Sequence, residues 1–241
     1  KGVKKTLHDF LFHLSSPMGH FEDLHEAVVF DIARGDRPGD LAKDRPAASS
    51  SESSKFEGLP KTKALIDKGN QELPDVNLYK HMRNGFRAAH EAMATETPQE
   101  SRAKWRESRA VFKKFAQERG YKNAPKLLGS NMKTEKSSGE GVNTKGLSLA
   151  PHSTNGLKGF DTCPNASSEC RKNCLGTEAG GNKQYPDTAL SAKVLKTHFL
   201  ALHPEHAARI LDRELDNHVK KSKKLGMVPG VNVLYGLGNS I

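Results

Sequence analysis

The sequence is poor in cysteine and contains no long hydrophobic run. No stretch approaches the roughly 18 apolar residues of a transmembrane helix, so we expect no membrane span within these 241 residues. Three cysteines are too few for a disulfide scaffold, and 21 glycines are far fewer than the one residue in three that collagen requires. No internal repeat is visible. These absences leave one or two globular domains, which suits a chain of this length.

Positive charge is the main feature of the composition, and it is unevenly distributed. Lys and Arg together number 38 against 28 Asp and Glu, which gives a formal net charge of +10. Residues 1–77 hold eleven basic and thirteen acidic residues, whereas residues 78–241 hold 27 basic and 15 acidic ones, a net charge of +12. A basic function, such as binding to nucleic acid, is therefore expected downstream of residue 77.

Composition also divides the chain. Residues 7–33 are predicted to be helical with a break near Pro17, and the Ser- and Ala-rich stretch that begins at Pro46 has too little apolar surface to offset its ordering entropy. We therefore expect four units: a helical segment at 1–45, a disordered linker at 46–58, a helical hairpin at 59–124 and an α/β domain at 125–241.

Four histidines lie in the N-terminal segment: His8, His13, His20 and His25. Two histidines on one helix share a face when they are three or four residues apart, whereas the pairs here are five apart. We therefore expect these histidines to be solvated or to cap helices rather than to bind a metal.

The hairpin is predicted from two amphipathic stretches. Apolar residues recur at helical spacing from Leu78 to Met93. A second helix is expected to begin at Thr97, because an N-cap threonine, a proline at the first helical position and a capping-box glutamate, Glu100, follow one another. Gly120 suits the left-handed residue that ends a helix.

The second helix of this hairpin carries four basic residues in a row along one side: Arg102, Arg106, Arg109 and Lys113. Their steps of four, three and four residues place them on one narrow stripe. A line of cations can follow the phosphates of a nucleic acid, and the binding would then weaken steeply with salt. The alternative is an ordinary solvated helix face.

Downstream, the order of elements predicts an α/β fold. A glycine-rich stretch from Leu127 is expected to be loop apart from a short strand at 146–149, and neither phosphate-binding glycine motif occurs in it. Helices at 188–202 and from Pro204, then a strand at 231–237, complete a parallel crossover. The expected fold class is α/β: a helical N-terminal part followed by a partial parallel domain with a barrel-like or open sheet. Ligands of such sheets bind at the carboxyl ends of the strands.

All three cysteines lie in one polar stretch, residues 160–176, which we call the cysteine segment. Cys163, Cys170 and Cys174 would be scattered if they served packing alone, and one disulfide would leave the third cysteine unpaired. Thiolates bind zinc or an iron-sulfur cluster, so one metal centre is predicted. The candidate fourth ligands are His152, Asp161 and His198, unless the open position binds a substrate or cofactor. Unligated thiols are the alternative.

Two functions from different classes follow. In one, an enzyme uses a three-thiolate iron-sulfur cluster with an open iron, and the basic surface binds a nucleic acid or nucleotide. The cysteines are separated by six and then three residues, which differs from the three and two of radical S-adenosylmethionine enzymes. In the other, zinc stabilises the cysteine segment of a basic nucleic-acid-binding module without catalysis.

Several short motifs resemble the phage gene product 88 family, which is uncharacterised. They are Leu127–Asn131, Lys136–Ser137, Gly146–Pro151 and the cysteine segment through Cys174–Leu175. The resemblance covers about residues 125–241. It implies a phage or prophage origin and a location in the cytoplasm of a bacterial host. It supplies no activity.

The two ends of the sequence suggest a piece of a longer protein. The first residue is Lys1 rather than methionine, and no strand is predicted after the one at 231–237. A strand in that position usually continues into further elements. We therefore expect the domain to be truncated at Ile241.

Overall fold

The computed structural model describes residues 59–71, 77–130, 132–151, 154–163, 167 and 186–235. The expected helical segment at 1–45 and the expected linker at 46–58 lie outside these residues. So do His152, Cys170 and Cys174.

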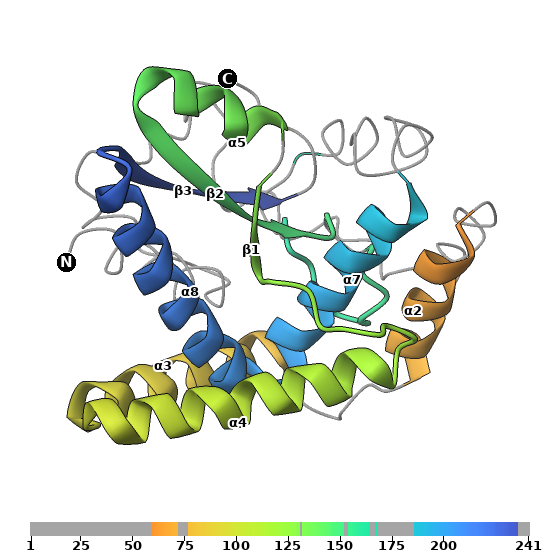
Figure 1. Ribbon diagram of the computed structural model, residues 1–241. Coiled ribbons are helices and arrows are strands. Elements are labelled where there is room, and N and C mark those ends of the chain that lie inside the picture. Colours follow the sequence, from red (N-terminus) through yellow and green to blue (C-terminus); the bar gives the residue numbers. More distant parts are fainter. Residues whose placement is uncertain are drawn as a thin grey trace.

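Helices make up most of the described chain, and three strands form a small sheet (Figure 1). The helices are α2 (Pro60–Gln71), α3 (Leu78–Thr95), α4 (Pro98–Gln117), α5 (Met132–Lys136), α7 (Asp187–Leu202) and α8 (Pro204–Lys224), with a 3-10 turn η2 (Ser137–Glu140). The strands are β1 (Leu128–Gly129), β2 (Val142–Leu149) and β3 (Val228–Tyr235). The order in the sheet is β1-β2-β3.

The sheet confirms the expected α/β class and the crossover. Strand β2 pairs with β3 in parallel, and helices α7 and α8 connect the two. Strand β1 pairs with β2 antiparallel, so the sheet is mixed rather than wholly parallel. The chain between β1 and β2 forms only the five-residue helix α5 and the 3-10 turn η2, and it returns beside β1 as an antiparallel neighbour.

The two helices predicted for the hairpin form as α3 and α4, and each packs mainly on α7 and α8 rather than on the other. The Glu100 carboxylate accepts a hydrogen bond from the Thr97 backbone N–H at 2.8 Å, and Thr97 Oγ1 accepts one from the Glu100 N–H at 3.3 Å. Gly120 has φ 79°, the left-handed conformation expected after a helix end. Local signals therefore located α4 correctly.

The glycine-rich stretch contains more structure than expected. It holds β1, α5 and η2, and β2 begins at Val142 instead of Gly146. The parallel ladder pairs Val142 with Val228, so both strands begin before their apolar centres. Strand β3 begins at Val228 rather than at Val231, and its expected end at residue 237 lies outside the described residues. Helix α2 was not predicted. It begins with a proline at its first position and buries Leu65 and Ile66.

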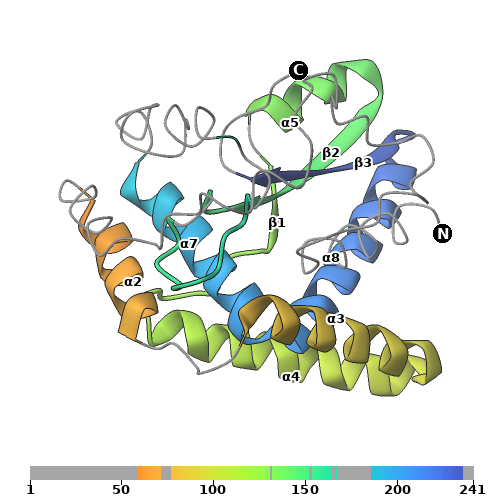
Figure 2. The same ribbon diagram turned by 180° about the vertical axis from the view of Figure 1, so that it is seen from behind.

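One hydrophobic cluster runs through the expected hairpin and the expected α/β domain. Phe112 of α4 stacks on Phe199 of α7, with the ring centroids 4.2 Å apart. Helix α3 lies so close to the start of α8 that a Cβ at Gly85 would fall 2.4 Å from Pro204 Cγ. Figure 2 shows α3 and α4 together along one side of the molecule, crossing the ends of α7 and α8.

Candidate functional site

The cysteine segment begins at the carboxyl end of β2. The chain leaves β2, passes through a turn at 154–160 and returns to Ala150, where Thr162 Oγ1 donates a hydrogen bond to the Ala150 carbonyl at 2.5 Å. The Ala150 N–H donates to Thr197 Oγ1 of α7 at 2.9 Å. Cys163 therefore lies beside the strand end at which ligands of parallel sheets bind.

A tyrosine from the hairpin also contacts this point. The Tyr79 hydroxyl donates to the Asp161 carbonyl at 2.8 Å and accepts from the Asp161 N–H at 2.7 Å. Asp161 Oδ1 in turn accepts the Cys163 N–H at 2.7 Å. Helix α3 thus fixes the backbone immediately before the first cysteine.

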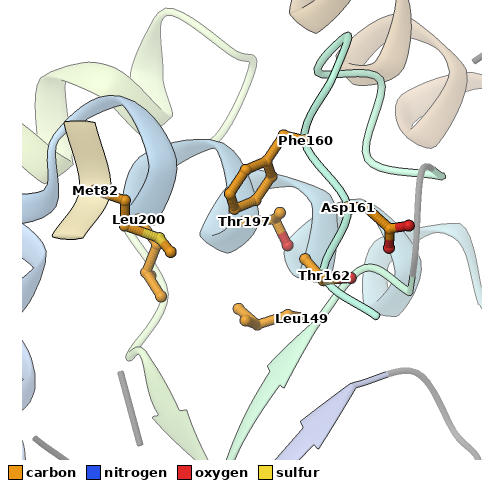
Figure 3. A pocket seen from close by; sticks show the side chains of 7 residues that line it. All are labelled: Met82, Leu149, Phe160, Asp161, Thr162, Thr197 and Leu200. Atoms are coloured by element: carbon orange, nitrogen blue, oxygen red, sulfur yellow. The ribbon is translucent and has the colours of Figure 1, made fainter. Parts of the chain in front are cut away.

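A small pocket lies between these elements (Figure 3). Its lining is mostly apolar, and it is too small for an organic substrate. The lining residues are Met82, Leu149, Phe160, Asp161, Thr162, Thr197 and Leu200. The pocket is therefore part of the packing beneath the first cysteine rather than a substrate cleft.

Asp187, the first residue of α7, joins this helix to the start of α2. The Asp187 carboxylate accepts the Lys61 and Thr62 N–H groups, each at 2.8 Å, and the Thr62 hydroxyl at 2.6 Å. Burial acts to raise the pKa of Asp187, but the hydrogen bonds from Thr62 and Lys61 outweigh it and the pKa is lowered. Hydrogen bonds to α3 therefore fix the chain just before residue 164, and hydrogen bonds to α2 fix it just after residue 185.

Two of the candidate metal ligands, Asp161 and Cys163, lie near the carboxyl end of β2. Cys163 is partly exposed, and its Sγ lies 3.9 Å from Thr162 Oγ1. Asp161 is partly exposed beside it. Cys170, Cys174 and His152 are outside the described residues, and no group of three His, Cys, Asp or Glu within those residues is placed to hold a metal.

His198 is part of the core. It is fully buried, and its Nε2 lies 2.5 Å from the Asn155 carbonyl oxygen. Its Nδ1 is buried without a hydrogen-bond partner in the described structure. Burial lowers the pKa of His198 to about 4, so the ring is neutral at pH 7. As a metal ligand it would have to use Nδ1.

The four basic residues of α4 differ in exposure. Arg102, Arg106 and Lys113 are exposed, whereas Arg109 is half-buried. The Arg109 guanidinium donates to the Pro125 carbonyl at 3.5 Å and lies 5.8 Å from the centre of the Phe112 ring. Arg109 is therefore engaged in the fold, and the exposed part of the stripe consists of the other three residues.

Two charged residues near Arg109 were not singled out from the sequence: Lys196, which is buried, and Glu214, which is half-buried. Glu214 of α8 accepts the Leu127 and Leu128 N–H groups at 3.3 and 2.7 Å and thereby fixes the start of β1. Burial raises the pKa of Glu214, and burial lowers the pKa of Lys196 on α7, which faces it. In the sequence, Glu214 lies next to Leu211 and Leu215 in the apolar pattern of α8. This position was the sequence feature that could have indicated a contact with the core.

A family model described as Gene product 88 matches residues 90–233. No curated protein and no solved structure matches the chain. The match begins within α3 and includes all of α4, so it extends further toward the N-terminus than the resemblance from residue 125 suggested. None of the described helices is long and apolar enough to cross a membrane.

Proposed function

Since the chain belongs to the Gene product 88 family, and the match includes the cysteine segment, we propose that Cys163, Cys170 and Cys174 bind one metal centre at the carboxyl end of β2. The observation that carries the proposal is the pair of hydrogen bonds between Tyr79 and Asp161, together with the bond from the Cys163 N–H to Asp161. These bonds present a partly exposed thiol from a rigid position, as a metal ligand requires.

The residues favour an iron-sulfur cluster over zinc. A structural zinc site needs a fourth protein ligand, and His198 is fully buried in the core with its Nε2 facing the Asn155 carbonyl. An iron-sulfur cluster needs only the three thiolates and can leave one iron open to a substrate. Arg171 and Lys172, next to Cys170 in the sequence, would lower the pKa of its thiol. Zinc with Asp161 as the fourth ligand is the alternative.

Anaerobic purification followed by iron, sulfide and zinc analysis tests this proposal. We expect close to one cluster per chain, with visible absorption, and loss of the metal in Cys163→Ser, Cys170→Ser and Cys174→Ser. Ser168→Ala, in the same segment, is the matched control and should keep the metal. Absence of both iron and zinc from the parent, or a full metal content in Cys170→Ser, would contradict the proposal.

A second candidate function is nucleic-acid binding by α4, favoured by the exposure of Arg102, Arg106 and Lys113. Each phosphate neutralised contributes about −0.9 to the slope of log K against log salt for duplex DNA. The double variant Arg102→Glu/Arg106→Glu should therefore bind duplex DNA at least about tenfold more weakly at low salt, with a slope shallower by about two.

The control for this experiment is Lys114→Glu. Lys114 is exposed on α4 but lies off the stripe, so its charge reversal changes the net charge without changing the line of cations. Fluorescence anisotropy with labelled DNA measures both variants. An equal loss of affinity per reversed charge in the two variants would show that α4 makes no specific phosphate contact.

A further inference from the structure

A histidine lies at the junction between α7 and α8, where the α3–α4 hairpin packs. His203 is the single residue between the two helices and is half-buried. Its ring meets Phe115 of α4 edge-on, with centroids 5.2 Å apart and an angle of 84° between the rings. On the α7 side it packs against Phe199 at 5.5 Å. A change at His203 therefore acts directly on the contact between α4 and α7.

The groups that face His203 are mostly basic, and they come from every element packed there. His206 of α8 has its ring centroid 6.4 Å away, and its Nδ1 lies 3.1 Å from Ser108 Oγ of α4. His81 of α3 lies against the Leu202 carbonyl. Arg119, just after α4, places its guanidinium 3.5 Å from the centre of the Phe115 ring. Glu118 is the acidic group near His203, and its negative charge favours a proton on the ring, opposite to the effect of the basic groups.

This environment disfavours a proton on His203. Burial lowers the pKa of His203, and His206, Arg119 and His81 lower it further, while Glu118 acts in the opposite direction. A protonated His203 would place another cation in a half-buried position near His206 and Arg119. The packed junction is therefore built around a neutral ring.

We propose that this junction is an acid-sensitive joint: protonation of His203 loosens the α3–α4 hairpin from the α7–α8 junction while the sheet stays folded. The proposal does not depend on the metal centre. It makes the position of α4, which carries the exposed cations Arg102, Arg106 and Lys113, responsive to pH.

The direction of the effect follows from linkage. The pKa of His203 is lower in the packed state than its ordinary value of 6.5, so packing is fully stable above pH 6.5. It weakens as the pH falls from 6.5 toward the lowered value, because the loosened state binds the proton more tightly. One proton can change the packing equilibrium by at most about tenfold per pH unit.

Hydrogen exchange at pH 7.5 and 5.5 tests the proposal. We expect protection factors in α3 and α4 to fall more than those in β2, by up to about tenfold. Trp105, the chain's only tryptophan, lies on α4 and reports the same change by fluorescence. In His203→Phe the ring contacts with Phe115 and Phe199 can persist without a titrating group, so the pH response should disappear.

Two further measurements separate this role from a purely structural one. Arg119→Met keeps a contact with the Phe115 ring but removes a cation, so the pH response should become smaller without vanishing. Nuclear magnetic resonance titration of the parent protein gives the pKa of His203 even when the variants fold poorly. A pKa at or above 6.5, an unchanged response in His203→Phe, or an equal loss of protection in α4 and β2 would each overturn the proposal.

Discussion

Single polar side chains fix the irregular segments of this fold to its helices. Tyr79 holds Asp161, Asp187 holds the first turn of α2, and Glu214 holds the start of β1. Each of these contacts joins residues 82 to 126 positions apart in the sequence. A backbone group without such a partner would lose a hydrogen bond on burial, so each side chain should have a measurable effect on stability.

Tyr79→Phe tests the contact that positions the first cysteine. The phenylalanine can keep the ring contact with Phe160, but the N–H and carbonyl of Asp161 lose their partner. We expect a loss of about 1–2 kcal/mol in the free energy of unfolding, measured with urea, and a reduced metal content. Tyr121→Phe is the matched control, because it removes a hydrogen bond to Ser191 instead. An equal metal content in the two variants would show that Tyr79 does not position the site.

Two glycines with similar backbones should respond differently to alanine. Gly156 has φ 79° and Gly159 has φ 75°, so either substitution costs about 1–2 kcal/mol of backbone strain. A Cβ at Gly156 would also fall 2.5 Å from the Ile66 carbonyl oxygen of α2, whereas nothing lies within 4 Å of one at Gly159. Gly156→Ala should therefore lower the melting temperature clearly more than Gly159→Ala. Equal shifts would mean that α2 does not pack as described.

At the scale of elements, the sequence predicted those with local signals. Helix α4 was located by its capping box, and α8 by the proline at its start and its apolar stripe. The starts of β2 and β3 were predicted too late because strand length depends on the partner strand, which no local pattern encodes. Helix α2 was missed because the Asp187 carboxylate that caps it lies 125 residues or more away.

The candidate site was predictable to a similar degree. Clustering of the three cysteines was visible in the sequence, and so was their place after a strand. The contacts from Tyr79 and Thr197 were not visible, because both residues lie on helices where their types suit an ordinary core position. The role of Arg109 was also hidden, since its spacing on α4 matches that of the exposed cations.

Asp187 should contribute to stability through the start of α2. Asp187→Asn keeps the size of the side chain but removes the charge and one acceptor oxygen, so the loss should be about 1 kcal/mol, typical of a helix cap. The pKa of Asp187 is lowered by folding, so its contribution is present above its ordinary pKa of 3.8 and is lost as the pH falls through the lowered value. Urea unfolding should show a difference from the parent at pH 7 that disappears in strong acid. A difference that persists there would contradict this account.

At the scale of the whole molecule, the hairpin and the α/β part share their core. Phe112 and Phe115 of α4 both contact Phe199 of α7, and α3 packs against α8 through Gly85. Figure 1 shows the same arrangement, with α4 running beneath the ends of α7 and α8. Because the hairpin and the α/β part share this core, they should unfold together at neutral pH.

Phe199→Ala tests this cooperativity at pH 7.5, above the range in which His203 would take up a proton. Phe199 of α7 is fully buried against the hairpin, so its truncation should cost about 3–5 kcal/mol. Trp105 fluorescence reports the hairpin, and far-ultraviolet circular dichroism reports all the helices. The two signals should give one urea midpoint in the parent, and both should move together in the variant. Leu225→Ala, at a side chain that is 56% exposed, is the control and should stay within about 0.5 kcal/mol of the parent. Two separate midpoints in the parent protein would show instead that the hairpin is an independent unit.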